Sequence, residues 1–229
     1  MNSDLTESSF PEYSNRIILT DKPLDLTSAD VVRIFKRNFS LKKVGHSGTL
    51  DPRATGLLIL CTDKMTKEIN EIIDLDKEYE GIIRIGARTK SFDTETEEEE
   101  IKDEISVSDQ EIEKARSSFL GETEQTPPMY SALKHKGKPL YKLARKGKVI
   151  KREPRKILIS EFELSRLSKT ELYFRICSSK GTYIRVIAND LGERLGTGGY
   201  LKTLRRLRIG NFELRDLDNE LNGIKYRLL

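Results

Sequence analysis

Cysteine, histidine and long apolar runs are scarce in this 229-residue sequence, and each shortage excludes a class of protein. The two cysteines, Cys61 and Cys177, each lie inside an apolar run, so we expect small buried residues instead of a disulfide or a metal pair. With only two histidines and no clustered cysteines or carboxylates at ligand spacing, no metal site is predicted. No stretch reaches the length of a membrane span, and residues 1–13 lack the basic and apolar blocks of a secretion signal. These shortages favour a cytoplasmic protein that does not contact a membrane.

Charge is abundant but unevenly distributed. Eight acids and one lysine lie between Asp93 and Glu104, whereas eleven Lys or Arg residues and one acid lie between Lys134 and Lys156. A second basic cluster near the end of the chain contains Lys202, Arg205, Arg206 and Arg208. Basic strips of this kind are typical of surfaces that bind an RNA backbone. The alternative is that these charges form ordinary solvated faces.

Local patterns predict alternating strands and helices. Thr27 with Asp30 and Ser108 with Glu111 have the spacing of capping boxes, and each pair precedes apolar residues at helical spacing. Further helices are expected at 139–146 and 184–195, and strands at 16–20, 56–61, 77–86, 156–164, 171–177 and, weakly, as a pair within 201–214. Gly121 and Gly196 are expected to stop the helices that precede them. The absence of a repeat and of a regular βαβ period predicts an α+β domain whose mixed, largely antiparallel sheet is flanked by helices.

The densest polar stretch runs from Gly45 to Pro52 and leads directly into the apolar strand 56–61. Asp51 precedes a proline, which restricts its backbone to an extended conformation, and Gly48 permits close approach of a ligand. An Asp-Pro pair in a loop is nevertheless an ordinary turn more often than a catalytic site. The glycine-rich character also suggests a phosphate-binding loop, but the Gly-Lys-Ser/Thr ending that such a loop needs is missing.

Residues 45–58, with the sequence GHSGTLDPRATGLL, closely resemble the catalytic motif of the TruB family of tRNA pseudouridine synthases. The resemblance extends in order and spacing from about Lys22 to Gly210. Its other motifs are Lys22-Pro23 with Thr27-Ser28, 64–67 (KMTK), 77–80 (KEYE), 125–134 (QTPPMYSALK), Leu140-Tyr141 with 144–147 (ARKG), 180–185 (KGTYIR) and 204–206 (LRR).

This resemblance implies a pseudouridine-synthase fold and isomerisation of uridine 55 in the T loop of tRNA, without a cofactor. The base would be cut from its sugar, turned and rejoined through carbon. Asp51 would be the nucleophile, whether it attacks the sugar or the base or assists a glycal route. Arg185 matches its counter-charge, which would keep the carboxylate ionised. Tyr79 matches the tyrosine that stacks on the flipped base and takes part in proton transfer.

The same resemblance assigns substrate-binding residues and a domain organisation. His46 matches a residue that supports the flipped nucleotide, Lys22 and Leu204 match pocket-lining residues, and Gly48 and Tyr183 complete the expected set. The implied domains are a flexible N-terminus (1–14), a catalytic domain (15–215) and a short tail (216–229) in place of a C-terminal RNA-binding module. Within the catalytic domain, residues 125–156 match a mobile, basic, RNA-gripping insertion, called the basic excursion below.

Asp25 is a departure, because the family motif usually carries a glycine two residues after the proline. The expected partner is the tRNA T stem-loop, while hairpins in other RNAs that resemble the T loop stay open as substrates. The oligomeric state is also open, with a monomer favoured. A non-catalytic RNA-binding protein on the same fold is the main alternative, and the presence of Asp51, Tyr79 and Arg185 argues against it.

Overall fold

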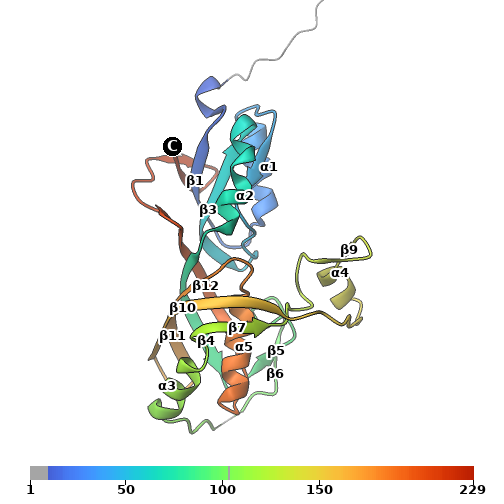
Figure 1. The fold of residues 1–229 in the computed structure, drawn as a ribbon, viewed down its shortest axis with the longest axis vertical. Coiled ribbons are helices and arrows are strands. Elements are labelled where there is room, and N and C mark those ends of the chain that lie inside the picture. Colours follow the sequence, from blue (N-terminus) through green and yellow to red (C-terminus); the bar gives the residue numbers. More distant parts are fainter. Residues whose placement is uncertain (1–9, 103) are drawn as a thin grey trace, which may run out of the picture. The chain divides into compact units, whose positions relative to one another are not determined.

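The computed structural model describes residues 10–102 and 104–229, so the expectation of flexibility for residues 1–9 lies outside the described part. The chain divides into two compact units, which we call unit 1 (Met1–Tyr79 with Arg205–Leu229) and unit 2 (Glu80–Leu204). The two divisions fall inside the strands β4 (Lys77–Ile85) and β12 (Gly199–Ile209). Figure 1 shows the elements of both units along the chain. Each unit is described separately below.

Unit 1 is built around antiparallel strands in the order β14-β15-β1-β3, with β2 also paired to β3. Their bounds are β1 Ile17–Lys22, β2 Val44–His46, β3 Ala54–Thr62, β13 Phe212–Glu213, β14 Asn219–Leu221 and β15 Ile224–Leu228. The helices are η1 Pro11–Tyr13, α1 Ser28–Asn38, η2 Asp63–Lys67 and α2 Ile69–Asp74.

Both faces of β3 are apolar, and each is covered by a different helix. Leu58 and Leu60 belong to one buried cluster together with Phe35 of α1. The alternate residues of β3, such as Ile59, belong to a second cluster that contains Ile72 of α2. Because successive side chains of a strand point to opposite faces, α1 and α2 cover opposite faces of this sheet. The run predicted as a buried strand therefore forms the centre of unit 1 (Figure 1).

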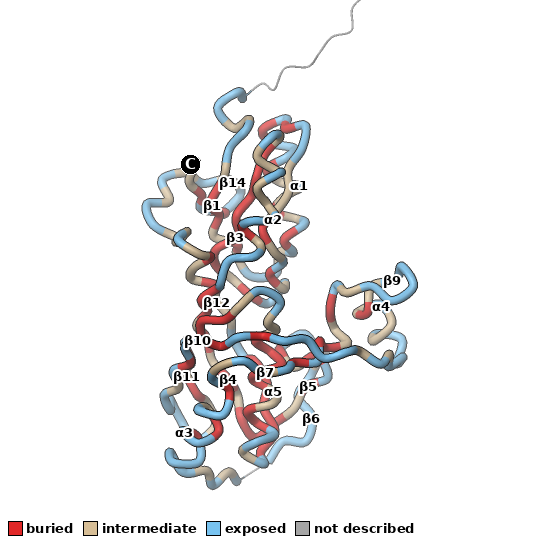
Figure 2. Tube along the Cα trace, viewed as in Figure 1, coloured by how far each residue is buried: buried red, intermediate tan, exposed pale blue. Residues whose placement is uncertain are grey.

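Unit 2 contains the remaining strands and helices. Its strands are β5 Arg88–Thr89, β6 Glu98–Glu99, β7 Gly121–Gln125, β8 Lys134–His135, β9 Lys138–Pro139, β10 Arg155–Arg166 and β11 Glu171–Ser178, and its helices are α3 Asp109–Ser117, α4 Leu140–Ala144 and α5 Ile184–Arg194. Strand β10 pairs antiparallel with both β7 and β11. Phe119, just beyond α3, makes an edge-to-face contact with Phe162 of β10 at 5.9 Å between ring centroids. Figure 2 shows buried residues along these strands and along α5.

The structure confirms the predicted fold class and most of the predicted elements. Both capping boxes are present, with Thr27 accepting from the Asp30 amide and Ser108 accepting from the Glu111 amide. Cys61 and Cys177 are both buried and neither is in a disulfide, as expected. The pairings of β1 with β3 and β15, of β10 with β7 and β11, and of β2 with β3 are antiparallel, whereas an isolated bridge between Asp93 and Leu201 is parallel. No helix among the described residues is both long and apolar enough to cross a membrane.

The structure differs from three expectations, one about the end of a helix and two about segments near the ends of the described chain. Helix α3 ends at Ser117, and Gly121 begins the strand β7 instead of stopping the helix. Residues 10–14 are not a loose extension, because Tyr13 stacks on Phe39 at 3.7 Å between ring centroids. Residues 219–228 are not a tail, since they form the hairpin β14–β15, which pairs with β1.

The hairpin has a sequence signal that explains it. Asn222 and Gly223 both have positive φ, at 51° and 77°, which is the conformation of the two-residue turn that Asn-Gly favours. Leu221 pairs with Ile224 across this turn, and Ile224 and Tyr226 are buried in the cluster that contains Phe35. The end of the described chain therefore contributes to the core of unit 1.

Candidate active site

Asp51 lies in the loop that joins β2 to β3 in unit 1, and this loop is tied to β3 on both sides. The amide of Ser47 donates to the carbonyl oxygen of Ile59 at 3.0 Å, and the amide of Ala54 donates to that of Asp51 at 3.0 Å. Ser47 is completely buried, whereas Asp51 is partly exposed. The strand therefore fixes the loop backbone while the Asp51 side chain can still reach solvent or a ligand.

The first residue of α1 holds the loop at the position before Asp51. Ser28 Oγ accepts from the amide of Leu50 at 2.9 Å and donates to its carbonyl oxygen at 3.1 Å. Both residues are buried, so the two hydrogen bonds satisfy main-chain groups that water cannot reach. Ser28 was not predicted as a site residue, although Thr27-Ser28 was among the family motifs.

Lys22 is completely buried at the end of β1 and supports the loop through main-chain contacts. Its ammonium donates to the carbonyl oxygens of Pro23 and Leu26 at 2.8 Å each and of Pro52 at 3.5 Å. The pKa of Lys22 is lowered to about 8, mainly by burial; the charge of Asp25 opposes this shift and the charge of Arg206 adds to it. The pocket-lining role expected for Lys22 stays a prediction, and these contacts add a supporting role.

Asp25 explains how the departure from the family motif is accommodated. Its φ is +66°, in the left-handed region that glycine adopts readily and that aspartate tolerates better than most residues. Its amide donates to the carbonyl oxygen of Pro52 at 2.9 Å, and its carboxylate accepts from Arg53 at 2.7 Å. The aspartate therefore keeps the backbone conformation of a glycine position and adds an ion pair.

Arg206 is a residue that the sequence reasoning placed wrongly. It was assigned to an exposed basic cluster, but it is 1% exposed. Its guanidinium donates to the carbonyl oxygens of Leu57 at 2.7 Å and Gly48 at 3.3 Å, and it is hydrogen-bonded to the side chain of Tyr79. Burial lowers the pKa of Arg206, and the hydrogen bond with Tyr79 opposes that shift. One buried cation thus connects two predicted site residues, Gly48 and Tyr79.

The other three members of that basic cluster are paired with acids. Arg205 makes two hydrogen bonds to Asp21, at 2.7 and 3.0 Å. Arg208 Nε donates to Glu78 at 2.8 Å, and Lys202 pairs with Glu171. The cluster is therefore largely neutralised by its neighbours, which corrects its interpretation as an RNA-binding patch.

His46 lies at the end of β2 and is partly buried. Its pKa is lowered chiefly by burial and further by the charge of Arg206, while a hydrogen bond with the main chain of Gly48 opposes the shift. The neutral imidazole is therefore favoured at neutral pH.

Tyr79 is 8% exposed, so it is as buried as a core residue, and its hydroxyl group is hydrogen-bonded to Arg206.

The remaining predicted residues, Arg185, Tyr183 and Leu204, belong to unit 2. Arg185 is 5% exposed, and burial lowers the pKa of its guanidinium to about 10. Its Nη2 donates to the carbonyl oxygen of Tyr130 at 2.6 Å, and its guanidinium carbon lies 5.2 Å from the centre of the Tyr183 ring. Burial raises the pKa of Tyr183. Leu204 is partly buried on β12.

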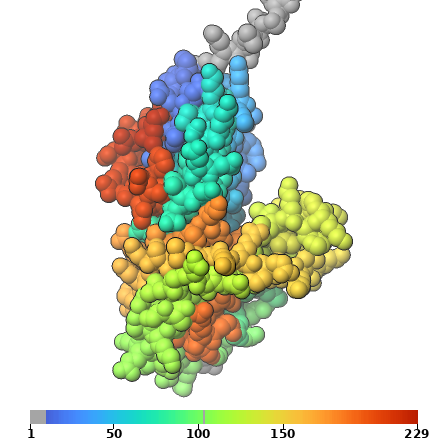
Figure 3. All heavy atoms as spheres, viewed as in Figure 1, coloured from blue at the N-terminus to red at the C-terminus, as the bar shows by residue number. Residues whose placement is uncertain are grey.

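The basic excursion joins the paired strands β7 and β10 and projects from the rest of unit 2 (Figure 3). Its lysines at 136, 138, 142 and 148 are exposed. A hollow of about 230 Å³ within the excursion is lined by apolar residues and by charged residues that include Lys134, Lys151 and Arg155. Leu140 is 3% exposed, so the segment has a small apolar core that the sequence reasoning did not foresee.

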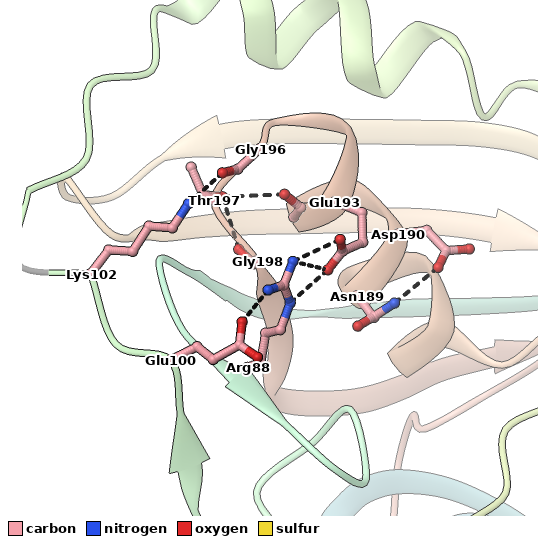
Figure 4. A network of polar contacts seen from close by, with 10 residues as sticks. Arg88, Glu100, Lys102, Asn189, Asp190, Glu193, Gly196, Thr197 and Gly198 are labelled. Carbon is pink, nitrogen blue, oxygen red and sulfur yellow. Dashed lines mark hydrogen bonds and ion pairs between the residues drawn. The ribbon is translucent and has the colours of Figure 1, made fainter. Parts of the chain in front are cut away.

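Residues 93–102 of the acidic stretch make several ion pairs with basic residues and are not simply a solvated loop. Arg88 donates to both carboxylate oxygens of Glu193 at 2.8 and 2.7 Å and also pairs with Glu100 (Figure 4). Lys102 donates to the carbonyl oxygen of Gly196 in the same network. Further along, Glu95 accepts from Arg145 of the basic excursion at 2.6 Å.

The structure thus gathers Asp51, His46, Gly48, Lys22 and Tyr79 in unit 1 and supports their loop from Ser28, Asp25 and Arg206. No group of three or more His, Cys, Asp or Glu side chains within 10–102 and 104–229 has the arrangement of a metal site. The roles assigned to the individual residues stay predictions.

Comparisons with known proteins identify the family. Residues 36–184 match the model of the TruB family pseudouridylate synthase (N terminal domain). The tRNA pseudouridine synthase B of Chlorobaculum tepidum is 52% identical over 204 residues, which cover 87% of this chain and 85% of that protein. The protein of the same name from Opitutus terrae is 48% identical over 200 residues, covering 87% and 83%.

Among solved structures, a Cbf5-Nop10-Gar1 complex contains a chain that superposes with a TM-score of 0.69 at 26% identity. The match covers 94% of this chain but just over half, 56%, of that one. A pseudouridylate synthase motif around Asp51, a matching family model over most of the chain and near-full-length relatives all agree. The chain therefore belongs to the TruB family of pseudouridylate synthases.

Proposed function

We propose that this protein is an isomerase that converts uridine 55 in the T loop of tRNA to pseudouridine. Membership of the family makes tRNA pseudouridine synthesis its activity, and the relatives from Chlorobaculum tepidum and Opitutus terrae are matched over 85% and 83% of their length. The observation that supports an active site at Asp51 is that Ser28 and β3 hold the backbone of its loop from two sides. The place of action is the cytoplasm, where tRNA is the substrate.

In the proposed mechanism, the reaction rearranges one nucleoside, so it requires a nucleophile and proton transfers but no second substrate. As the bond between C1′ and N1 breaks, the Asp51 carboxylate attacks the sugar or the base or assists a glycal route, and any bond that it forms to the substrate is broken again before the product leaves. The freed base turns, its C5 bonds to the sugar, and the proton displaced from C5 is balanced by one gained at N1. The flipped uridine stacks on the ring of Tyr79 and is supported by His46, Gly48, Tyr183 and Leu204.

Arg206 supports the role of Tyr79 in proton transfer. A guanidinium has only donors, so in its hydrogen bond with Tyr79 the phenol oxygen must be the acceptor. The hydroxyl hydrogen of Tyr79 then stays available to a group on the substrate. Arg185 is proposed as the counter-charge of Asp51, and its pKa of about 10 leaves it protonated at neutral pH.

We propose that the protein recognises its substrate through contacts between the basic excursion and the T stem-loop of tRNA. Its exposed lysines suit contacts with phosphates, which fix position, while the folded loop of the RNA supplies the shape and the unpaired bases that are read. The protein is proposed to act as a monomer.

The test is conversion of a synthetic T-stem-loop hairpin, with pseudouridine mapped at each position by reverse-transcription stops or mass spectrometry. Wild-type protein should convert position 55 alone, and a hairpin with cytidine at that position should stay unmodified. Pseudouridine at another position, or only in RNAs other than tRNA, would contradict the proposed specificity.

Two variants test the proposed chemistry in the same assay. Asp51→Asn keeps the shape of the side chain and removes its charge, so turnover should disappear while hairpin binding is retained. Arg185→Met should cost several powers of ten in rate, because the carboxylate would lose its counter-charge. Near wild-type rates in folded variants would remove the residue concerned from the site.

A further inference from the structure

Gln125 has an unusual position for an amide side chain. It is the last residue of β7, it is 5% exposed, and both ends of its amide are bonded to one residue, Tyr183. Its Nε2 donates to the Tyr183 carbonyl oxygen at 3.1 Å, and its Oε1 accepts from the Tyr183 amide at 2.8 Å. A buried amide that uses a donor and an acceptor on the main chain of one residue holds that residue in one orientation and at one distance.

The residue that Gln125 holds determines where α5 begins. Tyr183 is the N-cap of α5, and no side chain of the helix caps it. Its carbonyl oxygen also accepts from the amides of Val186 and Ile187, so it begins the helical hydrogen-bond pattern. Arg185 follows two residues later and is buried, so the position of the helix start sets the position of the Arg185 backbone.

The Arg185 side chain returns to the segment that leaves Gln125. Its Nη2 donates to the carbonyl oxygen of Tyr130, five residues after Gln125 along the chain. Pro127 and Pro128 lie between them, and both are buried with φ fixed by their rings. The carbonyl oxygen of Pro127 also accepts from Arg152 on the returning part of the basic excursion, at 3.0 Å. A closed ring of contacts therefore lies at the root of the excursion, by which we mean residues 125–130. It runs from Gln125 to Tyr183, on to Arg185 and back to Tyr130.

The other end of α5 is held independently. Glu193 in the last turn receives both hydrogen bonds from Arg88, and Gly196 just beyond the helix receives one from Lys102 (Figure 4). Since the C-terminal end of α5 is fixed in this way, the Gln125 contact decides how the N-terminal end is oriented. A change at the excursion root therefore acts on the Arg185 side chain more than on the helix as a whole.

We propose that Gln125 is a positioning residue that couples RNA bound on the basic excursion to the placement of Arg185. This inference rests on the proposed function, which gives Arg185 its role in the reaction. Gln125 itself touches neither the substrate nor the reacting atoms. It holds the N-terminus of α5 and the excursion root in one register, so that the guanidinium is in place when the RNA is bound.

The experiment is a double-mutant cycle between Gln125→Met and Arg185→Lys, measured as the single-turnover rate with saturating T-stem-loop hairpin. Methionine matches glutamine in length but makes neither hydrogen bond. We expect Gln125→Met to slow the reaction by about a hundredfold, the effect of a small misplacement of a reacting group, with hairpin affinity changed by less than about threefold. Glu124→Gln, at the exposed preceding position of β7, is the matched control and should keep the wild-type rate.

The cycle separates positioning from a general structural role. If Gln125 acts through Arg185, its substitution should change the rate by less than about twofold in the Arg185→Lys background. The same hundredfold reduction in both backgrounds would overturn the inference and leave the proposed function intact. A wild-type rate for Arg185→Lys would show that a cation at this position is enough without the placement of a guanidinium, which would overturn the inference and leave the counter-charge role intact.

Folding is monitored by circular dichroism and the thermal midpoint, and rates are taken at a temperature where each variant is folded. If Gln125→Met does not fold, Gln125→Asn replaces it, because the shorter amide keeps the polarity and cannot bridge both Tyr183 atoms. Reduced thermal stability with an unchanged rate would also overturn the inference.

Discussion

The hydroxyl of Ser28 exchanges two hydrogen bonds with the main chain of Leu50, accepting from its amide at 2.9 Å and donating to its carbonyl oxygen at 3.1 Å. One side chain at the start of α1 therefore satisfies both main-chain polar groups of the residue before Asp51. Since Leu50 is 3% exposed, no water can replace the hydroxyl without a rearrangement of the loop.

Ser28→Ala should therefore affect both stability and catalysis. Leaving the buried Leu50 amide and carbonyl unpaired should lower the free energy of unfolding by roughly 1 to 3 kcal/mol. The loop should also loosen around Asp51, so the single-turnover rate should fall by at least about tenfold. Urea denaturation and rapid-quench kinetics measure the two effects. Ser40→Ala, at an exposed position after α1, is the control, and equal behaviour of the two variants would contradict this account.

Gly48 and Gly56 offer a second comparison within the same loop and strand. Both have positive φ, at 110° and 102°, but only Gly56 packs tightly. A Cβ at Gly56 would lie 2.3 Å from the carbonyl oxygen of Arg206, whereas a Cβ at Gly48 would meet nothing within 4 Å. Gly48→Ala should cost only the strain of the backbone conformation, about 1 to 2 kcal/mol.

Gly56→Ala should cost more than that strain, because β3 must move away from the backbone of Arg206. We expect a free energy of unfolding lowered by at least about 3 kcal/mol, or a protein that does not accumulate in folded form. The comparison is made by urea denaturation of both variants side by side. A Gly56→Ala protein as stable as Gly48→Ala would show that the close approach of Arg206 is relaxed at little cost.

These residues also show which parts of the molecule the sequence predicts. The capping boxes at Thr27 and Ser108 depend on contacts three residues apart, so local patterns were sufficient to find them. The loop of Asp51 was found because its residues are contiguous. The hairpin β14–β15 was missed although Asn222-Gly223 signals it, since the short strands around it have little apolar alternation.

Contacts between distant residues were out of reach of the same reasoning. Arg206 was interpreted as an exposed cation because nothing near it in the chain provides an acceptor, and its partners Leu57 and Gly48 lie 149 and 158 positions away. Gln125 and Tyr183 are 58 positions apart, and neither residue type predicts the other. A single sequence therefore indicated candidate residues in contiguous motifs better than the contacts between distant residues that hold those motifs in place.

The burial of Lys22 predicts a dependence of stability on pH. Its folded pKa of about 8 lies below the roughly 10.4 of an unfolded lysine, so between these values the unfolded state binds more protons. The free energy of unfolding contributed by Lys22 should then rise with pH from about 8 to about 10.4. Cys61 acts in the opposite direction at high pH, because burial raises its thiol pKa to about 11.

Comparison with Lys22→Met removes the effect of Cys61, which both proteins share. The free energy of unfolding of the wild type, minus that of the variant, should increase by up to roughly 3 kcal/mol between about pH 7.5 and about pH 10.5. Urea denaturation at several pH values in this range provides the measurement. Parallel curves for the two proteins would mean that the ammonium of Lys22 titrates as it does in water.

The last prediction concerns how the basic excursion holds RNA. The four lysines at 136, 138, 142 and 148 are exposed, whereas all four members of the cluster from Lys202 to Arg208 are bonded to groups of the protein itself. Binding to phosphates releases counterions, so replacing these four lysines by glutamine should weaken hairpin binding and flatten its dependence on salt. Each lysine–phosphate pairing that is removed should reduce the slope of log affinity against log salt by roughly 0.7 to 0.9, or by about 3 for all four.

A control protein with glutamine at Lys36, Lys42, Lys114 and Lys169, which are also exposed, has the same net charge and should keep the wild-type slope. Equal slopes for the two quadruple variants would show that the excursion lysines form an ordinary solvated face, and that the RNA is held elsewhere.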